Sequence, residues 1–306
     1  MNILSASNLS KMYGKYHAVN NISLNLKEGE ILGILGSNGA GKTTTIQMLL
    51  GVLTPTKGEI YYFGKKFNLH REEILERVNF SSTYTNLPWI LTVKENFNYI
   101  SYFYDIKNRK KRIKEIVELF KLEDLYNLKI NSLSAGQLTR VNLAKSFINY
   151  PSVLLLDEPT ASLDPEIAKY VREFILHQRK KFQVSIILTS HNMSEVEEVC
   201  DRVIFLDKGK IIADNTPEKL AQSIELVHIV LLISDGLKKT TEFCKRKKYF
   251  YKVDGRYLRV DMEEKNISQF LQELASISVI YDQISIDKPT LEDYFLQVVA
   301  QKKGKK

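Results

Sequence analysis

The chain has 306 residues, enough for one large domain and a smaller one, and its 44% hydrophobic and 26% charged residues are typical of globular proteins. No apolar run approaches the roughly 18 residues of a membrane-spanning helix, and Cys200 and Cys244 suggest neither a disulfide framework nor a zinc site. The first residues lack a secretory signal pattern, so we expect a cytoplasmic setting. The net charge of +8 points to nucleic acid or to an anionic membrane face, unless the lysines only solvate the surface.

After two antiparallel strands expected over 2–26, the chain carries a complete phosphate-binding pattern, G-x-x-x-x-G-K-[ST], at 36–43. The apolar run 30–35 before it predicts a buried strand, and 44–50 after it predicts a helix that stops at Gly51. The glycines let the backbone curl so that its N–H groups face phosphate oxygens. We therefore predict a nucleoside triphosphate site, with an ordinary glycine-rich turn as the alternative.

The side chains of this loop have separate expected tasks. Lys42 reaches the β- and γ-phosphates, and the Thr43 hydroxyl takes a coordination site on Mg²⁺. The residues expected to contact the nucleotide are Gly36, Asn38, Gly39, Gly41, Lys42, Thr43 and Thr44.

Strands and helices alternate along the rest of the first two thirds of the chain. Expected strands lie at 59–63, 78–81, 153–156, 184–189, 203–206 and 211–212, and expected helices at 70–76, 167–181 and 194–200. The stretch 92–150 is expected to be helical almost throughout. Thr92, with Glu95 three residues on, has capping-box spacing, and Ser134 is a second expected helix cap. The alternation predicts an α/β fold with a mainly parallel sheet, an antiparallel β edge and a helical subdomain.

Two adjacent carboxylates, Asp157 and Glu158, follow the apolar strand 153–156. Ligands bind beyond the C-terminal ends of strands in sheets of this kind. Asp157 is therefore placed to hold Mg²⁺, directly or through water, and Glu158 to polarise the water that attacks the γ-phosphate. The alternative is a charged turn after a strand.

After about residue 221 the pattern changes. Expected strands at 225–233 and 279–286, a hairpin at 254–255, and helices at 237–246, 265–275 and 291–299 follow one another in β-α-β-β-α-β-α order. This order predicts a small α+β, ferredoxin-like module. We expect two domains, a nucleotide-binding domain at 1–221 and an accessory or regulatory domain at 222–306. Its basic tail, 302–306, either contacts anionic lipid or only solubilises the chain.

Five motifs over residues 2–221 resemble those of the ABC transporter ATPases, a P-loop NTPase family. Leu133-Ser134-Ala135-Gly136-Gln137 resembles the signature motif, with Ala135 in place of the usual glycine. The resemblance makes Asp157-Glu158-Pro159-Thr160 the extended Walker B motif, Ser162-Leu163-Asp164 the D-loop, His191 the switch histidine and Tyr13 an aromatic that stacks on adenine. Simpler alternatives are a turn aromatic at Tyr13 and helix caps at His191 and Ser134.

The resemblance implies an ATPase that dimerises head to tail around ATP and Mg²⁺. Ser134, Gly136 and their neighbours in one subunit cover the ATP of the other, and Gln137 and Asp164 join the expected nucleotide contacts. It also implies a separately encoded transmembrane permease, contacted around 83–104, and a peripheral position on the inner face of the membrane. The ending 289–296 resembles the close of cassettes in multidrug- and antibiotic-export systems, which favours export.

One departure concerns the glutamine that the family places near the start of the helical subdomain. That position falls at Thr83, and the segment 81–86 holds no glutamine. Thr83, Asn86 or a water substitutes for it, or hydrolysis is slow. We expect an active but sluggish ATPase.

Two other functions fit parts of the sequence. One is a soluble ABC ATPase acting on nucleic acid or the ribosome, and the other is a nucleotide-gated regulatory module with little turnover. The chain lacks the second cassette, long coiled coil or zinc motif of the first class, so we do not expect a nucleic-acid partner. The joint presence of Asp157, Glu158 and His191 argues against the second.

Overall fold

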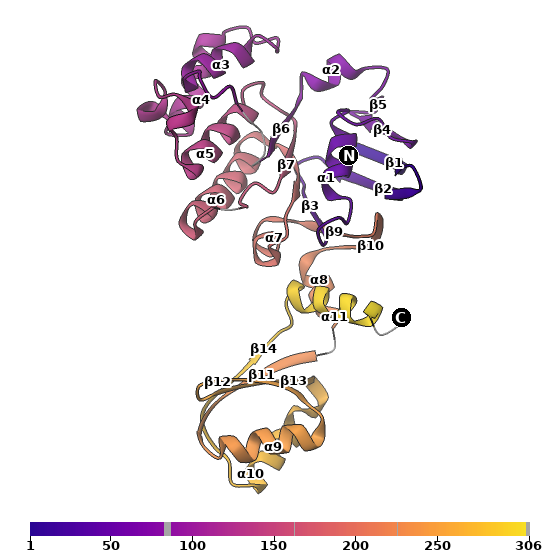
Figure 1. Cartoon of the computed structure of the whole chain (residues 1–306), viewed down its shortest axis with the longest axis vertical. Coiled ribbons are helices and arrows are strands. Elements are labelled where there is room, and N and C mark those ends of the chain that lie inside the picture. Colours follow the sequence, from indigo (N-terminus) through magenta and orange to yellow (C-terminus); the bar gives the residue numbers. More distant parts are fainter. Residues whose placement is uncertain (83–86, 162, 225, 304–306) are drawn as a thin grey trace. The chain divides into compact units, whose positions relative to one another are not determined.

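The computed structural model describes residues 1–82, 87–161, 163–224 and 226–303 (Figure 1). The chain divides into two compact units, Met1–Thr216 and Pro217–Lys306. Among the described residues, no helix has the length and apolar character needed to cross a membrane.

The first unit is built on a six-stranded sheet with the strand order β10-β9-β3-β8-β7-β6. The strands are β3 (Ile31–Leu35), β6 (Val78–Ser82), β7 (Val153–Asp157), β8 (Ser185–Thr189), β9 (Arg202–Asp207) and β10 (Lys210–Asn215). All neighbours run parallel except β9 and β10, which are antiparallel. Every residue of β3, β7 and β8 is buried, as expected for parallel strands covered on both faces.

A second, four-stranded antiparallel sheet of order β2-β1-β4-β5 forms the expected β edge. It consists of β1 (Asn2–Tyr13), β2 (Tyr16–Lys27), β4 (Lys57–Tyr62) and β5 (Lys65–Lys66). Leu4 and Leu26 of this sheet share one hydrophobic core with Ile34 of β3 and with Ile46, which lies on the helix α1 (Lys42–Leu49). Because α1 contacts both β2 and β7, the loop ahead of it is held by both sheets.

The remaining helices of this unit are α2 (Arg71–Leu75), α3 (Val93–Ser101), α4 (Arg109–Leu119), α5 (Ala135–Ser146), α6 (Pro165–Phe182) and α7 (Met193–Val199). The stretch 92–150, expected to be helical almost throughout, is divided among α3, α4 and α5, with two short 3-10 turns at Glu123–Leu125 and Ile130–Ser132. Local caps explain the division. The Asn108 side chain accepts a hydrogen bond from the N–H of Lys111 and so caps a new helix, α4.

The two helix caps expected from the sequence are confirmed. The Thr92 and Ser134 side chains each accept a hydrogen bond from the third helical residue, Glu95 and Gln137 respectively. Those two side chains in turn accept from the N–H groups of Thr92 and Ser134, so both caps are complete capping boxes.

The second unit has a four-stranded antiparallel sheet of order β12-β13-β11-β14, the arrangement of the expected ferredoxin-like module. Its elements are α8 (Pro217–Gln222), β11 (Leu226–Asp235), α9 (Leu237–Lys247), β12 (Phe250–Asp254), β13 (Tyr257–Glu263), a 3-10 turn (Glu264–Asn266), α10 (Ile267–Ser276), β14 (Ile280–Asp287) and α11 (Leu291–Lys303). Phe243 of α9 and Phe270 of α10 pack on Ile229 and Leu231 to form a separate core. The unit begins slightly before residue 221, because α8 packs with α11.

Candidate functional site

The phosphate-binding loop runs from the end of β3 to the start of α1, at Lys42. Two of its glycines fill positions that admit no side chain. A Cβ on Gly36 would lie 2.3 Å from the carbonyl oxygen of Leu206, and one on Gly41, whose φ is 106°, would lie 2.5 Å from that of Ala18. The loop therefore lies tightly against β2 and β9, and its conformation is set by that packing.

The other expected nucleotide contacts in this loop differ in exposure. Asn38, Gly39 and Thr43 are exposed, and Thr44 is half-buried at the first turn of α1. The next residue, Thr45, is buried and donates its hydroxyl to the Gly41 carbonyl at 2.8 Å, which anchors the start of the helix. Polar groups of the loop and of the first helical turn are therefore exposed to solvent. The start of the helix is held by the buried Thr45 hydroxyl.

Lys42 is the buried cation of the loop. Its Nζ donates a hydrogen bond to the Gly36 carbonyl at 2.7 Å and lies 3.8 Å from Oε1 of Glu158. The ammonium thus connects the loop after β3 with the end of β7. These two strands are not neighbours, because β8 lies between them in the sheet. A cation held between a glycine loop and a carboxylate is suited to an anionic ligand such as a phosphate.

The ends of the neighbouring strands β7 and β8 meet at the same edge of the sheet. Asp157 is buried and lies opposite Thr189 in the strand register. The Thr189 hydroxyl donates to Oδ1 of Asp157 at 2.6 Å and accepts from the N–H of Glu158 at 3.0 Å. Thr189 was not singled out from the sequence. The signal that would have found it is its place at the end of a buried strand next to β7.

Glu158 has a φ of 53°, in the left-handed region that non-glycine residues rarely adopt. Its N–H donates to both the hydroxyl and the carbonyl of Thr189, which holds this conformation. The carboxylate then contacts two cationic or ionisable groups, with Oε1 near Lys42 and Oε2 2.7 Å from Nδ1 of His191. Strained backbone of this kind clusters at functional sites.

The structure thus brings together four of the expected site residues: Lys42, Asp157, Glu158 and His191. The remaining residues of the glycine loop and of the first turn of α1 lie next to Lys42, whereas five expected site residues lie on other elements. Ser134 is exposed at the start of α5, with Gly136 and Gln137 in the first turn, and Asp164 is the N-cap of α6. Tyr13, at the end of β1, is 51% exposed, and the Lys11 ammonium lies 5.4 Å from its ring centroid.

The segment expected to replace the family glutamine lies outside the described residues, since Thr83 and Asn86 fall within 83–86. The preceding residue, Ser82, lies opposite Asp157 in the register of β6 with β7. The chain therefore leaves β6 at the edge of the sheet where Asp157 and Glu158 are.

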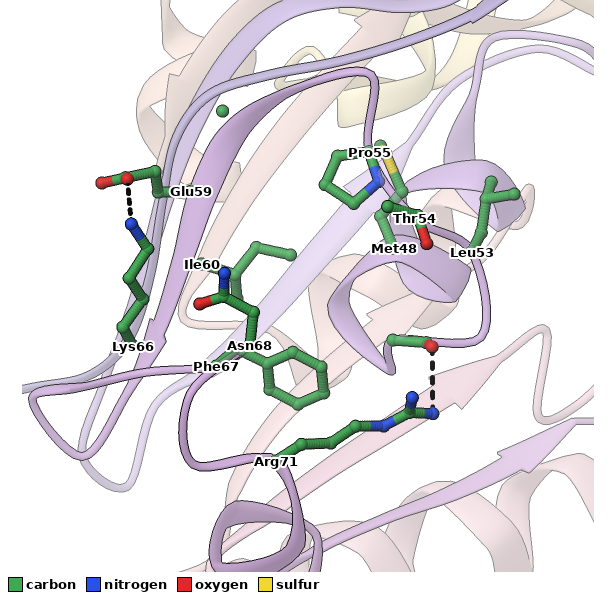
Figure 2. A pocket seen from close by; sticks show the side chains of 12 residues that line it. Met48, Leu53, Thr54, Pro55, Glu59, Ile60, Lys66, Phe67, Asn68 and Arg71 are labelled. Atoms are coloured by element: carbon green, nitrogen blue, oxygen red, sulfur yellow. Dashed lines mark hydrogen bonds and ion pairs between the residues drawn. The ribbon is translucent and has the colours of Figure 1, made fainter.

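A cavity of about 400 Å³ lies at the other end of α1, between that helix, β4 and α2 (Figure 2). Its floor is apolar, from Met48, Ile60 and Phe67, and Arg71 closes one side by donating to the Gly51 carbonyl at 3.1 Å. None of its 12 lining residues is an expected nucleotide contact. It is therefore separate from the candidate site.

Comparisons with known proteins agree with this geometry. A family model described as "ABC transporter" matches residues 19–161. The chain is 37% identical over 220 residues to the Nod factor export ATP-binding protein I of Burkholderia orbicola, covering 71% of each chain. It is 30% identical over 308 residues to the linearmycin resistance ATP-binding protein LnrL of Bacillus subtilis, covering 98% of this chain and 99% of that one. A dimeric ATP-binding cassette solved in a post-hydrolysis state with ADP and Pi matches with a TM-score of 0.62 and 28% identity, over 70% of this chain and 98% of that one.

Proposed function

Because the chain belongs to the ABC transporter family, as an ATPase that serves as an ATP-binding subunit, we propose that it powers a separately encoded membrane permease that exports its substrate. Two names support export: one relative is a Nod factor export protein and the other a linearmycin resistance protein. The match to LnrL extends over nearly the whole chain, so it includes the second unit. The nucleic-acid and regulatory alternatives receive no such support.

The observation that carries the proposal is the position of the Glu158 carboxylate between Lys42 and His191. In our account Lys42 turns its ammonium to the β- and γ-phosphates, and Glu158 orients a water and takes up its proton as it attacks the γ-phosphate. His191, whose side chain is 64% exposed, contacts the γ-phosphate from the other side of Glu158. Gly36, Asn38, Gly39, Gly41, Thr43 and Thr44 surround the phosphates with N–H and hydroxyl donors.

The residues present also fit Mg²⁺. Asp157 is a buried carboxylate with one oxygen already fixed by Thr189, and the Thr43 hydroxyl is exposed at the start of α1. Hard oxygen ligands of this kind are those that Mg²⁺ prefers, and the ion would neutralise phosphate charge there. We therefore propose Thr43 and Asp157 as the protein ligands of Mg²⁺.

The signature residues are proposed to act on the ATP of a second subunit, in a dimer of two copies or of two related subunits. Ser134 suits this role because its Oγ accepts the capping hydrogen bond from Gln137 and so keeps its own proton for donation to a phosphate. Its exposure leaves it accessible to a partner. Gly136, Gln137 and Asp164 would flank it, and Tyr13 would stack on the adenine.

The permease contact is proposed to lie on α3 and on the segments just before and after it. Large apolar side chains are exposed there, with Trp89 at 71% and Tyr102 at 73%, accompanied by Ile90, Tyr99 and Phe103. Large exposed apolar side chains gathered in one segment, of which Tyr99 and Phe103 are in ring contact, are typical of a protein–protein interface. Binding there would hold the subunit at the inner face of the membrane.

The second unit is proposed to be an accessory or regulatory domain and the first unit the ATPase domain, with the boundary at Thr216–Pro217 in place of the 221 expected from the sequence. It contributes none of the four residues that meet at the candidate site. Its basic tail, 302–306, remains a proposed contact for anionic lipid; residues 304–306 lie outside the described residues.

The test is affinity purification of the tagged chain from detergent-solubilised native membranes, with identification of what co-purifies. We expect a polytopic membrane protein in about equal amount. A variant with Trp89→Ala and Tyr102→Ala should lose that partner while still binding ATP. Recovery with RNA or ribosomes and no membrane protein would overturn the transporter proposal.

A further inference from the structure

A buried carboxylate, Glu195, lies beside the candidate site without belonging to the set expected from the sequence. It is the third residue of α7 and is only 2% exposed. Its Oε1 accepts from the Thr160 hydroxyl at 2.6 Å, and its Oε2 accepts from the Ser190 hydroxyl at 2.7 Å. Thr160 follows Glu158 by two residues, and Ser190 immediately precedes His191.

Helix capping alone does not explain these contacts. A glutamate at the third helical position usually reaches back to the N–H of the capping residue. Here the N–H of the cap, Asn192, donates instead to Ser190 Oγ at 3.0 Å, while the Asn192 side chain accepts from the N–H of Glu195 at 3.3 Å. The Glu195 carboxylate is therefore released from its usual role and reaches across to the loop after β7.

The contacts close a ring around the catalytic pair. The loop after β7 holds Glu158 and Thr160, the loop after β8 holds Ser190 and His191, and the Glu195 carboxylate joins the two loops. Hydrogen bonds to a carboxylate are stronger than those between neutral groups, and this one is shielded from water. The loops of Glu158 and His191 are thus joined twice, by the 2.7 Å contact between these two side chains and by the buried Glu195 carboxylate.

We propose that Glu195 is a positioning residue for ATP hydrolysis. It does not touch the nucleotide, but it fixes the loop of Glu158 against the loop of His191 so that both side chains are oriented before ATP binds. This inference rests on the roles proposed above for Glu158 and His191. Misplacing a reacting group by about 1 Å can slow a reaction about a hundredfold, so a fixed loop spacing has a large effect on rate.

Thr160 provides a matched pair of variants. Thr160→Val removes the hydroxyl with little change of shape, and Thr160→Ser keeps it. We expect Thr160→Val and Glu195→Ala to lower kcat about tenfold or more, with the KM for ATP within about twofold, and Thr160→Ser to recover most of the rate. A loss confined to KM or to thermal stability would overturn the proposal.

Two further readouts separate positioning from a merely structural contact. In a His191→Ala background, Thr160→Val should lower kcat by a clearly smaller factor than in the unmodified protein, because one of the two side chains that the contact orients is gone. In addition, Thr160→Val should shift the imidazole nitrogen signals of His191 in NMR spectra and leave those of His70 unchanged; the chain has five histidines. Equal rate losses in both backgrounds, with no shift at His191, would contradict the inference.

The controls distinguish failure of this inference from failure of the proposed function. If the unmodified protein hydrolyses ATP no faster than Glu158→Gln, the proposed role of Glu158 fails, and the role of Glu195 fails with it. If Glu158→Gln is inactive and Thr160→Val is fully active, only the positioning role of Glu195 fails.

Discussion

Oε2 of Glu158 lies 2.7 Å from Nδ1 of His191, although 33 residues separate them in the chain. The contact follows from topology, because β7 and β8 are parallel neighbours and their carboxyl ends lie at one edge of the sheet. Thr189 adds to it by holding the backbone of Glu158 in a left-handed conformation. A carboxylate oriented in this way needs little rearrangement to act as a general base.

Lys42→Ala is expected to weaken ATP binding about tenfold or more, which corresponds to about 1.4 kcal/mol or more. The substitution removes the cation that bridges the loop and Glu158. Calorimetric titration with ATP measures the affinity, with the exposed Lys210 as a control in Lys210→Ala. Unchanged affinity in Lys42→Ala would refute the phosphate-binding assignment.

Ser134→Arg is expected to leave ATP binding by the monomer within about twofold of normal and to block an ATP-dependent dimer. Ser134 is exposed and lies outside the cluster around Lys42, so the ATP bound to the Lys42 loop of the same subunit should be unaffected. A bulky cation at that position would collide with the partner's nucleotide site. Light scattering with and without ATP, in a Glu158→Gln background that slows hydrolysis, measures the dimer; a normal dimer would disprove the shared site.

Lys145 predicts a pH dependence of stability. Burial lowers the pKa of Lys145 from its ordinary 10.5 to about 8, and its Nζ donates to the Phe80 carbonyl at 2.9 Å. Because the unfolded chain binds the proton more tightly, this group should make the folded state more stable as the pH rises from about 8 to 10.5. Lys145→Met lacks the titration, so the free energy of unfolding of the unmodified protein should increase relative to the variant over that range. Urea unfolding of both proteins at several pH values measures this difference; a constant difference would contradict it.

His228 is expected to stabilise the second unit. Its Nδ1 lies 2.7 Å from Asp261 of β13, and its Nε2 lies 3.0 Å from Asp293 of α11, with 7% of its side chain exposed. His228→Ala would leave two partly buried carboxylates facing the gap, and we expect a loss of about 2 kcal/mol, less than for a fully buried pair. Hydrogen exchange in β11 and α11 measures it, with His177→Ala, on the exposed face of α6, as control. Unchanged exchange would show that the cluster contributes nothing.

The sequence predicted the α/β fold and the ferredoxin-like module because both rest on local signals. A complete glycine loop between a strand and a helix, and an apolar strand that ends in two carboxylates, are readable without any tertiary information. The family resemblance, which the comparisons confirm, rests on the same motifs. The nearly continuous helical stretch predicted for 92–150 is three separate helices in the structure, because the cap at Asn108 gives only a weak signal in the sequence.

The contacts between strands were not predictable in the same way. Thr189 and Glu195 each act on a residue more than 30 positions away, so their roles depend on the order of β7 and β8 in the sheet. The functions of the individual site residues, from Tyr13 to His191, remain predictions.

The measurement that tests the account most directly is steady-state ATP hydrolysis by the purified protein and by Glu158→Gln, at saturating ATP with Mg²⁺. We predict measurable turnover by the unmodified protein and a rate at least about a hundredfold lower in the variant, with ATP affinity retained, because only the general base is lost. Equal rates in the two proteins would contradict the proposed mechanism.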